Sequence, residues 1–158
     1  MKRILPCLLA VLSAGAGTAR AETAWGLRGG ATFDPDQVHV GVHLNGGELF
    51  TDGWFVPNLE IGFGDNVTLV AINPELVYKF NQRSRAGWGF YIGAGLGLNI
   101  WSWDEDRFGR DHSDTDLGLN ILGGMSRKLS AGNDFFLELK LGVADAPDGK
   151  VTAGFTFY

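Results

Sequence analysis

The stretch WGFYIGAGLGLNIW, residues 88–101, alternates between two kinds of residue at almost every step. A period of two is typical of a β-strand whose two faces meet different surroundings. The length also suits a tilted strand that crosses a membrane. We expect one face to point outward and to carry Trp88, Phe90, Ile92, Ala94, Leu96, Leu98 and Ile100. The inward face would then carry Gly89, Tyr91, Gly93, Gly95, Gly97 and Asn99.

The same alternation recurs on both sides of this stretch, and no convincing helical stripe interrupts it. With it, the segments that alternate are 24–33, 37–45, 54–63, 68–80, 88–101, 116–128, 135–143 and 151–158. Turn-forming runs rich in Gly, Asp, Asn and Pro separate them. An even number of antiparallel strands that closes on itself leaves no free edge. The sequence therefore predicts an all-β fold, an eight-stranded antiparallel up-and-down transmembrane β-barrel over residues 22–158.

The direction of the barrel follows from where the charges fall. One face of the segments is almost wholly apolar, and the other mixes glycine with charged residues. These inward charges are Arg28, Glu60, Glu75, Lys79, Lys128, Glu138 and Lys140. A soluble lipocalin-like barrel has the opposite arrangement, and charges in its dry core would carry a large desolvation cost. A membrane barrel has a polar lumen. A soluble β-sandwich remains the alternative, because short alternating strands describe it as well.

Glycine and aromatic residues favour the same arrangement. The chain has 24 glycines, which lie largely inside the apolar segments and suit the crowded interior of a small barrel. If the mature N-terminus is periplasmic, one girdle of outward aromatic residues gathers at the periplasmic strand ends: Trp25, Phe55, Tyr78, Phe80, Trp88, Phe90, Phe135, Phe155 and Phe157. A thinner girdle at the opposite ends would consist of Phe33, Phe63 and Trp101 or Trp103.

The N-terminal residues 1–21 have the three regions of a secretory signal peptide. Lys2 and Arg3 precede an apolar run, and Ala-Arg-Ala at 19–21 fits a cleavage site, so we expect a mature chain from Glu22. A buried first helix is the alternative. The only cysteine, Cys7, would leave with the signal. Disulfides, thiolate-bound zinc and a cysteine nucleophile are then excluded from the mature chain.

The charge balance argues against a nucleic-acid partner. The full chain has 13 basic and 18 acidic residues, and loss of Lys2, Arg3 and Arg20 with the signal leaves 10 basic residues and a net charge of −8. No basic stripe of the kind that binds nucleic acid is present.

The signal, the eight strands and the terminal GFTFY resemble the small outer-membrane β-barrel family of Gram-negative bacteria, in the broad OmpA/OmpX/OmpW-like sense. The resemblance covers the whole mature chain and implies a bacterial outer-membrane location. It also implies that Phe155, Phe157 and Tyr158 form the signal read by the barrel assembly machinery. One departure is that Tyr158 lies one step beyond Phe157, which is the residue in phase with the lipid-facing positions.

The inward charges are the strongest candidate site. Counted from the periplasmic strand ends, Arg28, Glu60, Glu75, Glu138 and Lys140 fall at a similar depth. Opposite charges at one level predict a salt-bridge network that fills the lumen, since eight strands leave room only for side chains. A gated or narrow ion path is the alternative function of the same network.

Other candidates carry less. Asp111, His112, Ser113 and Asp114 are the residue types of a hydrolase triad, but neighbours in sequence rarely form one, and we interpret the loop 104–114 as a solvated acidic loop. It lacks the spacing of an EF-hand, although it could bridge cations to lipopolysaccharide.

His39 and His43 face inward without a third metal ligand, which predicts hydrogen bonding. Pro57 and Pro74 fall nearly opposite each other and predict a bulge or a broken ladder.

The sequence thus predicts a structural or envelope-maintenance protein without chemistry or cofactors of its own. A narrow channel for ions or small solutes is the second hypothesis and a lipid-A-modifying enzyme the third. The enzyme hypothesis suffers because the strand histidines point inward and Ser102 is the one serine near a loop-side strand end outside the acidic loop. Expected partners are outer-membrane lipid, lipopolysaccharide and, during biogenesis, the assembly machinery, with the protein a monomer.

Overall fold

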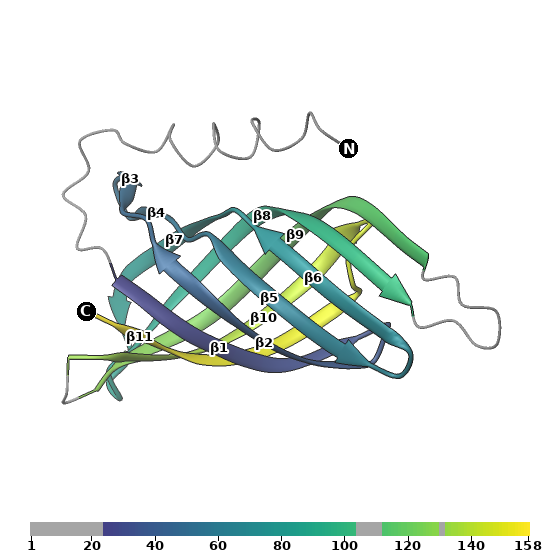
Figure 1. Ribbon diagram of the computed structural model, residues 1–158. Helices are drawn as coiled ribbons and strands as arrows, with labels where there is room; N and C mark the ends of the chain where they lie inside the picture. The colour runs from purple at the N-terminus through teal and green to yellow at the C-terminus, as the bar shows by residue number, and fades with distance from the viewer. Residues whose placement is uncertain (1–23, 104–111, 130–131) are drawn as a thin grey trace.

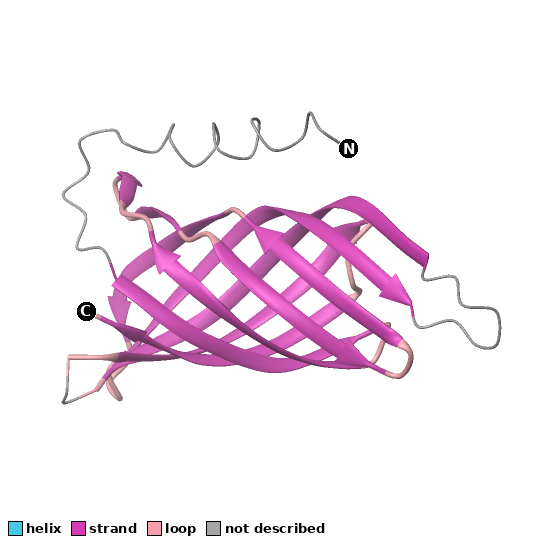
Figure 2. Ribbon diagram, in the orientation of Figure 1, coloured by secondary structure: helices cyan, strands magenta, loops and turns pink. Residues whose placement is uncertain are grey.

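The computed structural model describes residues 24–103, 112–129 and 132–158. The expected signal peptide and most of the acidic loop 104–114 lie outside these residues. In the described part every regular element is a β-strand (Figure 2), and no helix there could span a membrane. The strands are β1 (Ala24–Phe33), β2 (Gln37–Asn45), β3 (Glu48–Phe50), β4 (Gly53–Phe55), β5 (Asn58–Gly64), β6 (Val67–Asn73), β7 (Glu75–Arg83), β8 (Trp88–Trp103), β9 (His112–Lys128), β10 (Asp134–Ala144) and β11 (Gly149–Phe157).

These strands form one closed antiparallel barrel of eight strands. Going round the wall the order is β1, β2, β5, β6, β8, β9, β10 and β11, and β11 pairs with β1 again. β7 continues β6 along β8. On the other side of β7, β4 pairs with it, and β3 pairs in turn with β4 (Figure 1). The predicted barrel is therefore confirmed. The run 46–53, expected to be a turn, contains the short strand β3.

Figure 1 also distinguishes the two ends of the barrel. Residue 24 and the C-terminus lie together at one end, which we call the termini end. The turns between β1 and β2, β5 and β6, and β10 and β11 lie at the other, which we call the loop end. The start of β1 and the C-terminus meet because Trp25 pairs with Phe157 when β1 and β11 close the wall.

The two prolines break the ladder without shifting it. Phe55 pairs with Leu76 on one side of the break and Asn58 with Asn73 on the other, so Pro57 stands opposite Pro74 in an unchanged register. Since proline has no N–H to donate, regular strand pairing is interrupted in both segments at this level. The Pro57 carbonyl still accepts a hydrogen bond from the Leu44 N–H at 2.9 Å. The broken ladder is confirmed, and no bulge accompanies it.

The barrel has its apolar surface outside and its polar side chains inside. Outward residues such as Val38 and Leu117, each 64% exposed, cover the wall on all sides. The inside holds a mixed core in which a small apolar cluster of Val77, Tyr91 and Leu122 packs beside charged groups. A soluble monomer rarely exposes an apolar surface of this extent, so lipid or a partner must cover it.

Candidate functional site

Polar and charged side chains line the lumen along the length of the barrel. They come from alternate positions of the strands, as the period of two requires. The buried polar residues are Arg28, Thr32, Gln37, His39, His43, Asn45, Asn58, Glu60, Asn73, Glu75, Asn99, Asn120, Glu138, Lys140, Lys150 and Thr152. A buried polar group is costly without a partner, so the pairing inside this set decides what the lumen can do.

Three cations and three carboxylates pair at one level, and we call them the ionic layer. Arg28 pairs with Glu138 through Nη2, and its Nε lies 3.3 Å from Glu60 Oε1. Lys140 Nζ lies 2.5 Å from Glu75 Oε1 and 3.6 Å from Glu60 Oε1. Lys150 Nζ donates to Glu60 Oε2 at 2.8 Å. The ionic layer consists of Arg28, Glu60, Glu75, Glu138, Lys140 and Lys150.

Glycine makes the room in which these side chains meet. Arg28 has Gly41 opposite it on one neighbouring strand and Gly154 opposite it on the other. With no side chains at those two positions, the guanidinium can extend across the lumen to Glu60, whose strand lies beyond β2. A Cβ at Gly154 would lie 2.6 Å from the Phe136 ring, and that ring lies 5.6 Å from the Arg28 guanidinium carbon.

Tyr91 and Lys150 are members of this site that the sequence analysis missed. The Tyr91 hydroxyl donates to Glu138 Oε2 at 3.1 Å, which gives this carboxylate a second partner besides Arg28. Lys150 lies just before the predicted segment 151–158. The strand β11 begins at Gly149, and its alternation gives Lys150 the inward phase. Tyr91 was assigned to the inward face, but an aromatic hydroxyl gave no signal of its partner.

Lys79 and Lys128, predicted as members of the network, lie outside the ionic layer. Within the described residues neither comes within ion-pair distance of its carboxylates. Lys79 Nζ lies 4.1 Å from the Trp54 ring centroid, and Lys128 is exposed opposite Asp134. Lys79 lies four residues beyond Glu75, and Lys128 four residues beyond the cross-strand partner of Glu138. Four residues span roughly 13 Å of strand, which removes both lysines from the layer.

A cavity lies on each side of the ionic layer. The cavity at the termini end has a volume of about 70 Å³ and is lined by residues that include His43, Lys79 and Tyr91. The cavity at the loop end, about 440 Å³, is wider and open, and Asp34, Asp116, Asp145 and Asp148 line it. The two cavities share no lining residue, so the ionic layer and its buried neighbours separate them.

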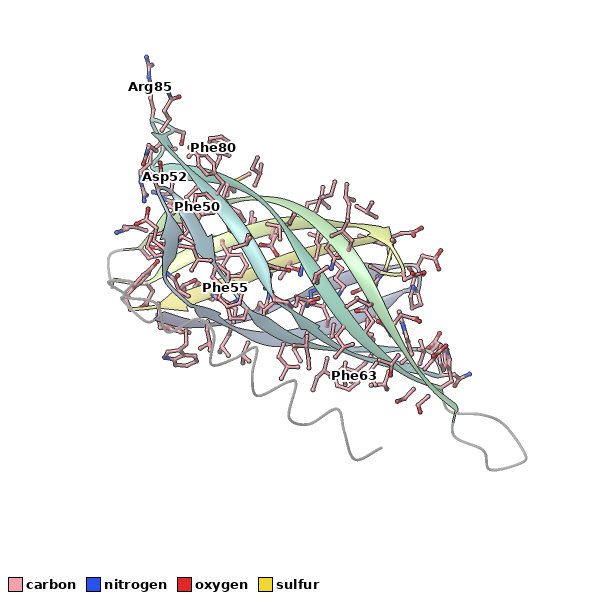
Figure 3. All side chains as sticks on the ribbon, turned by 90° about the horizontal axis from the view of Figure 1, so that it is seen from above. Phe50, Asp52, Phe55, Phe63, Phe80 and Arg85 are labelled. Atoms are coloured by element: carbon pink, nitrogen blue, oxygen red, sulfur yellow. The ribbon has the colours of Figure 1, made fainter. Side chains whose placement is uncertain are left out.

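The two tryptophans at the loop end correct one expectation. Trp101 and Trp103 line the loop-end cavity, where their rings stack at 6.1 Å with an interplanar angle of 17°. The prediction that one of them joins an outer girdle is therefore wrong, because the odd positions of β8 point inward throughout. Phe33 and Phe63 do face outward, at 50% and 56% exposure, and Figure 3 shows Phe63 far from the end that carries Arg85.

Both strand histidines serve as hydrogen-bonding groups in the lumen, as predicted. His39 bridges Thr32 and Thr152, with each ring nitrogen 3.0 Å from a hydroxyl oxygen. His43 Nε2 lies 3.0 Å from Thr156 Oγ1. The described residues contain no group of three or more His, Cys, Asp or Glu side chains that could hold a metal ion.

The terminal aromatic residues lie on the seam of the barrel. Phe157 and Trp25 face outward across the β1–β11 pair with ring centroids 4.9 Å apart, and Phe155 lies 5.3 Å from Phe135. The Tyr158 hydroxyl donates to Asp134 Oδ2 at 3.1 Å. Phe157, and not Tyr158, is thus in phase with the outward positions.

A barrel that is apolar outside, ionic inside and closed by eight strands has the architecture of a small outer-membrane β-barrel. Solved structures of that class are similar to this chain. Neisserial surface protein A (NspA) has 18% identity, covers 85% of this chain and 94% of its own, and gives a TM-score of 0.66. The N-terminal β-barrel domain of Pseudomonas aeruginosa OprF has 15% identity, covers 85% and 95%, and also gives 0.66.

The same fold also occurs in an enzyme. The outer membrane enzyme PagL has 15% identity with this chain, covers 85% of it and 99% of its own chain, and gives a TM-score of 0.51. No protein-family model matches the sequence, and no curated protein matches it either. At these identities the likeness defines the fold, and the role of the protein has to be argued from its own residues.

Proposed function

We propose that this chain is an outer-membrane β-barrel protein with a structural, envelope-maintenance role and a lumen plugged by the ionic layer. The observation that carries the proposal is the inverted distribution of polarity: apolar residues cover the outside, while Lys140, Glu60 and Glu75 are each 1% exposed inside. Contact of such a surface with lipid has no hydrophobic cost, whereas its contact with water is unfavourable.

The aromatic residues support a particular orientation in the membrane. Ring contacts link Trp25 to Phe157, Tyr78 to Phe80 and Trp88 to Phe135 at the termini end. Aromatic girdles lie at membrane–water interfaces, and we place the termini end, with its girdle, at the periplasmic interface. In this orientation the acidic loop end faces lipopolysaccharide, and the protein reaches the membrane as a monomer after signal cleavage.

The plug is supported by the balance of charge within the layer. Arg28, Lys140 and Lys150 face three carboxylates at ion-pair distance, so the ionised layer has no net charge, and all of its members are buried. The cost of burying these ions is offset only if all of them are paired. A permanently paired layer across a lumen of this width stops the passage of solutes.

Two measurements on purified mature protein test the proposal. Folded in detergent, the protein should have a β-rich circular dichroism spectrum and migrate faster on a gel when it is not boiled. Reconstituted into planar bilayers, it should show little or no single-channel current. A helical spectrum would contradict the barrel, and steady current would contradict the plug while leaving the barrel intact.

The second candidate is a narrow channel for ions or small solutes. It is favoured by the two cavities on opposite sides of the layer, since movement of a few side chains between them would join them. Steady wild-type current would select this function. A lipid-A-modifying enzyme is less well supported, because His39 and His43 both bond to threonines in the lumen, away from the lipid-facing surface.

A further inference from the structure

One charged residue interrupts the outward surface of the barrel strands. In β9 the exposed Leu119 and Ile121 show that the odd positions point outward, and Arg127 continues this phase near the end of the strand. Among the described residues, the other outward positions of the barrel strands carry no charge, and Arg127 itself is exposed. Arg127 stands at the level where the apolar wall ends, where a long side chain can reach the membrane–water interface.

Arg127 lies within the girdle of aromatic residues at the termini end. It pairs directly with Trp88 on one side and with Phe135 on the other. The rings of these two residues approach to 6.2 Å in an edge-to-face arrangement across the strand that carries Arg127. Among the described residues no carboxylate lies within ion-pair distance of the guanidinium.

The other exposed cations lie at the same end of the barrel as Arg127. The exposed lysine and arginine side chains of the described residues all lie at the termini end, and they are Arg83, Arg85, Arg127 and Lys128. Figure 3 shows Arg85 at the tip of the β7–β8 hairpin, beyond Phe80 and Asp52. At the loop end the exposed charges of the described residues are instead Asp34, Asp36, Asp65, Asp114, Asp145 and Asp148.

We propose that Arg127, between Trp88 and Phe135, binds the phosphate of an anionic phospholipid in the periplasmic leaflet. This inference rests on the proposed function, which places the termini end at that leaflet. A planar guanidinium can hold two phosphate oxygens at once. Tryptophan is enriched at headgroup level, and the apolar wall beside Ile92 and Leu137 continues from the site to receive the acyl chains. Arg83 and Arg85, exposed at the same end, also favour anionic over zwitterionic headgroups.

Fluorescence quenching can measure the preference for this lipid. The full mature chain is refolded into phosphatidylcholine bilayers that contain traces of either phosphatidylglycerol or phosphatidylcholine brominated on the acyl chains. Quenching of tryptophan fluorescence by each lipid gives their relative binding. We expect wild type to prefer phosphatidylglycerol and Arg127→Gln to lose roughly fivefold of that preference, the effect of one basic residue at a membrane surface. Arg127→Lys should retain an intermediate preference.

Lys128→Gln is the matched control. It removes the same charge from the next residue, but Lys128 is opposite Asp134, on the face that borders the termini-end cavity. Its preference should equal that of wild type. Equal preference in wild type and Arg127→Gln, or an equal loss in Lys128→Gln, would each overturn the inference. Absence of quenching by brominated phosphatidylcholine would overturn the proposed function as well.

Discussion

Lys140 and Lys150 stand directly opposite each other on β10 and β11, and their ammonium groups share the carboxylate of Glu60. Two like charges face to face on neighbouring strands would repel each other without a common counter-ion. Glu60 also lies 3.3 Å from the Arg28 guanidinium, so this one side chain contacts every cation of the ionic layer. It is therefore the residue on which the layer depends most.

Glu60→Gln should be the most destabilising conservative change in the lumen. It leaves three buried cations with two carboxylates, and loss of one partner of a buried pair costs about 3–5 kcal/mol. Urea unfolding in detergent or bilayers measures the free energy of unfolding. Lys150→Met added to Glu60→Gln restores the balance and should recover part of the loss. Asp36→Asn, at an exposed turn, should have no effect. Equal stability of Glu60→Gln and Asp36→Asn would show that the layer is solvated.

Glu138→Ala should open the plug. The change removes one of the two carboxylate partners of Arg28 and the acceptor of the Tyr91 hydroxyl, so both side chains lose a contact that holds them across the lumen. We expect stability to fall by a few kcal/mol and single-channel current to rise above a near-silent wild type. Steady wild-type current, with an unchanged melting temperature in the variant, would favour the channel function instead.

Gly124→Ala should destabilise the barrel while its neighbour tolerates the same change. A Cβ at Gly124 would lie 2.4 Å from Tyr91 Cζ and 2.6 Å from the Leu137 carbonyl oxygen. Overpacking of this kind costs roughly 1–3 kcal/mol. At Gly123, which points outward, a Cβ would meet only the Tyr91 carbonyl oxygen at 3.9 Å. Thermal unfolding of the two variants should differ accordingly, and similar melting temperatures would contradict the inward packing of Tyr91.

A disulfide between Ala31→Cys and Val151→Cys should form and lock the seam. These residues are register partners across β1 and β11, and directly opposed strand residues have the Cα separation that a disulfide needs. The oxidised variant should remain compact on gels after heating, unlike wild type. Ala31→Cys with Phe155→Cys, two pairs out of register, should not cross-link. Cross-linking of the second pair in place of the first would mean that the register at the seam is different.

Much of this architecture could be predicted from the period of two alone. Alternation assigned Arg28, Glu60 and Glu138 to the inside and Phe63 to the outside because each strand has only two faces. Depth along the barrel was harder, because it depends on the stagger between strands, which a single segment does not encode. Lys79 and Lys128 had the correct face at the wrong depth for the ionic layer.

Strand limits account for the other differences. The predicted last strand begins at Val151 and therefore omits Lys150, which lies in β11. Trp101 is predicted to face outward, but the alternation of β8 continues past Ile100 and turns it inward. Phe136 and Tyr91 carry no formal charge, so a search for opposite charges did not select them as members of the site. Contacts between neighbouring strands, which only the folded barrel supplies, were needed to find them.

The seam between β1 and β11 has a consequence for how the chain reaches its folded state. Arg28 and Glu138 are 110 residues apart in sequence, and Glu60 and Lys150 are 90 apart. Until the final strand closes the wall, Arg28 cannot reach Glu138 and Glu60 cannot reach Lys150, and unpaired charge is expensive within a low-dielectric membrane. Barrel closure and charge neutralisation are therefore a single cooperative event that comes late and depends on the most distant parts of the chain.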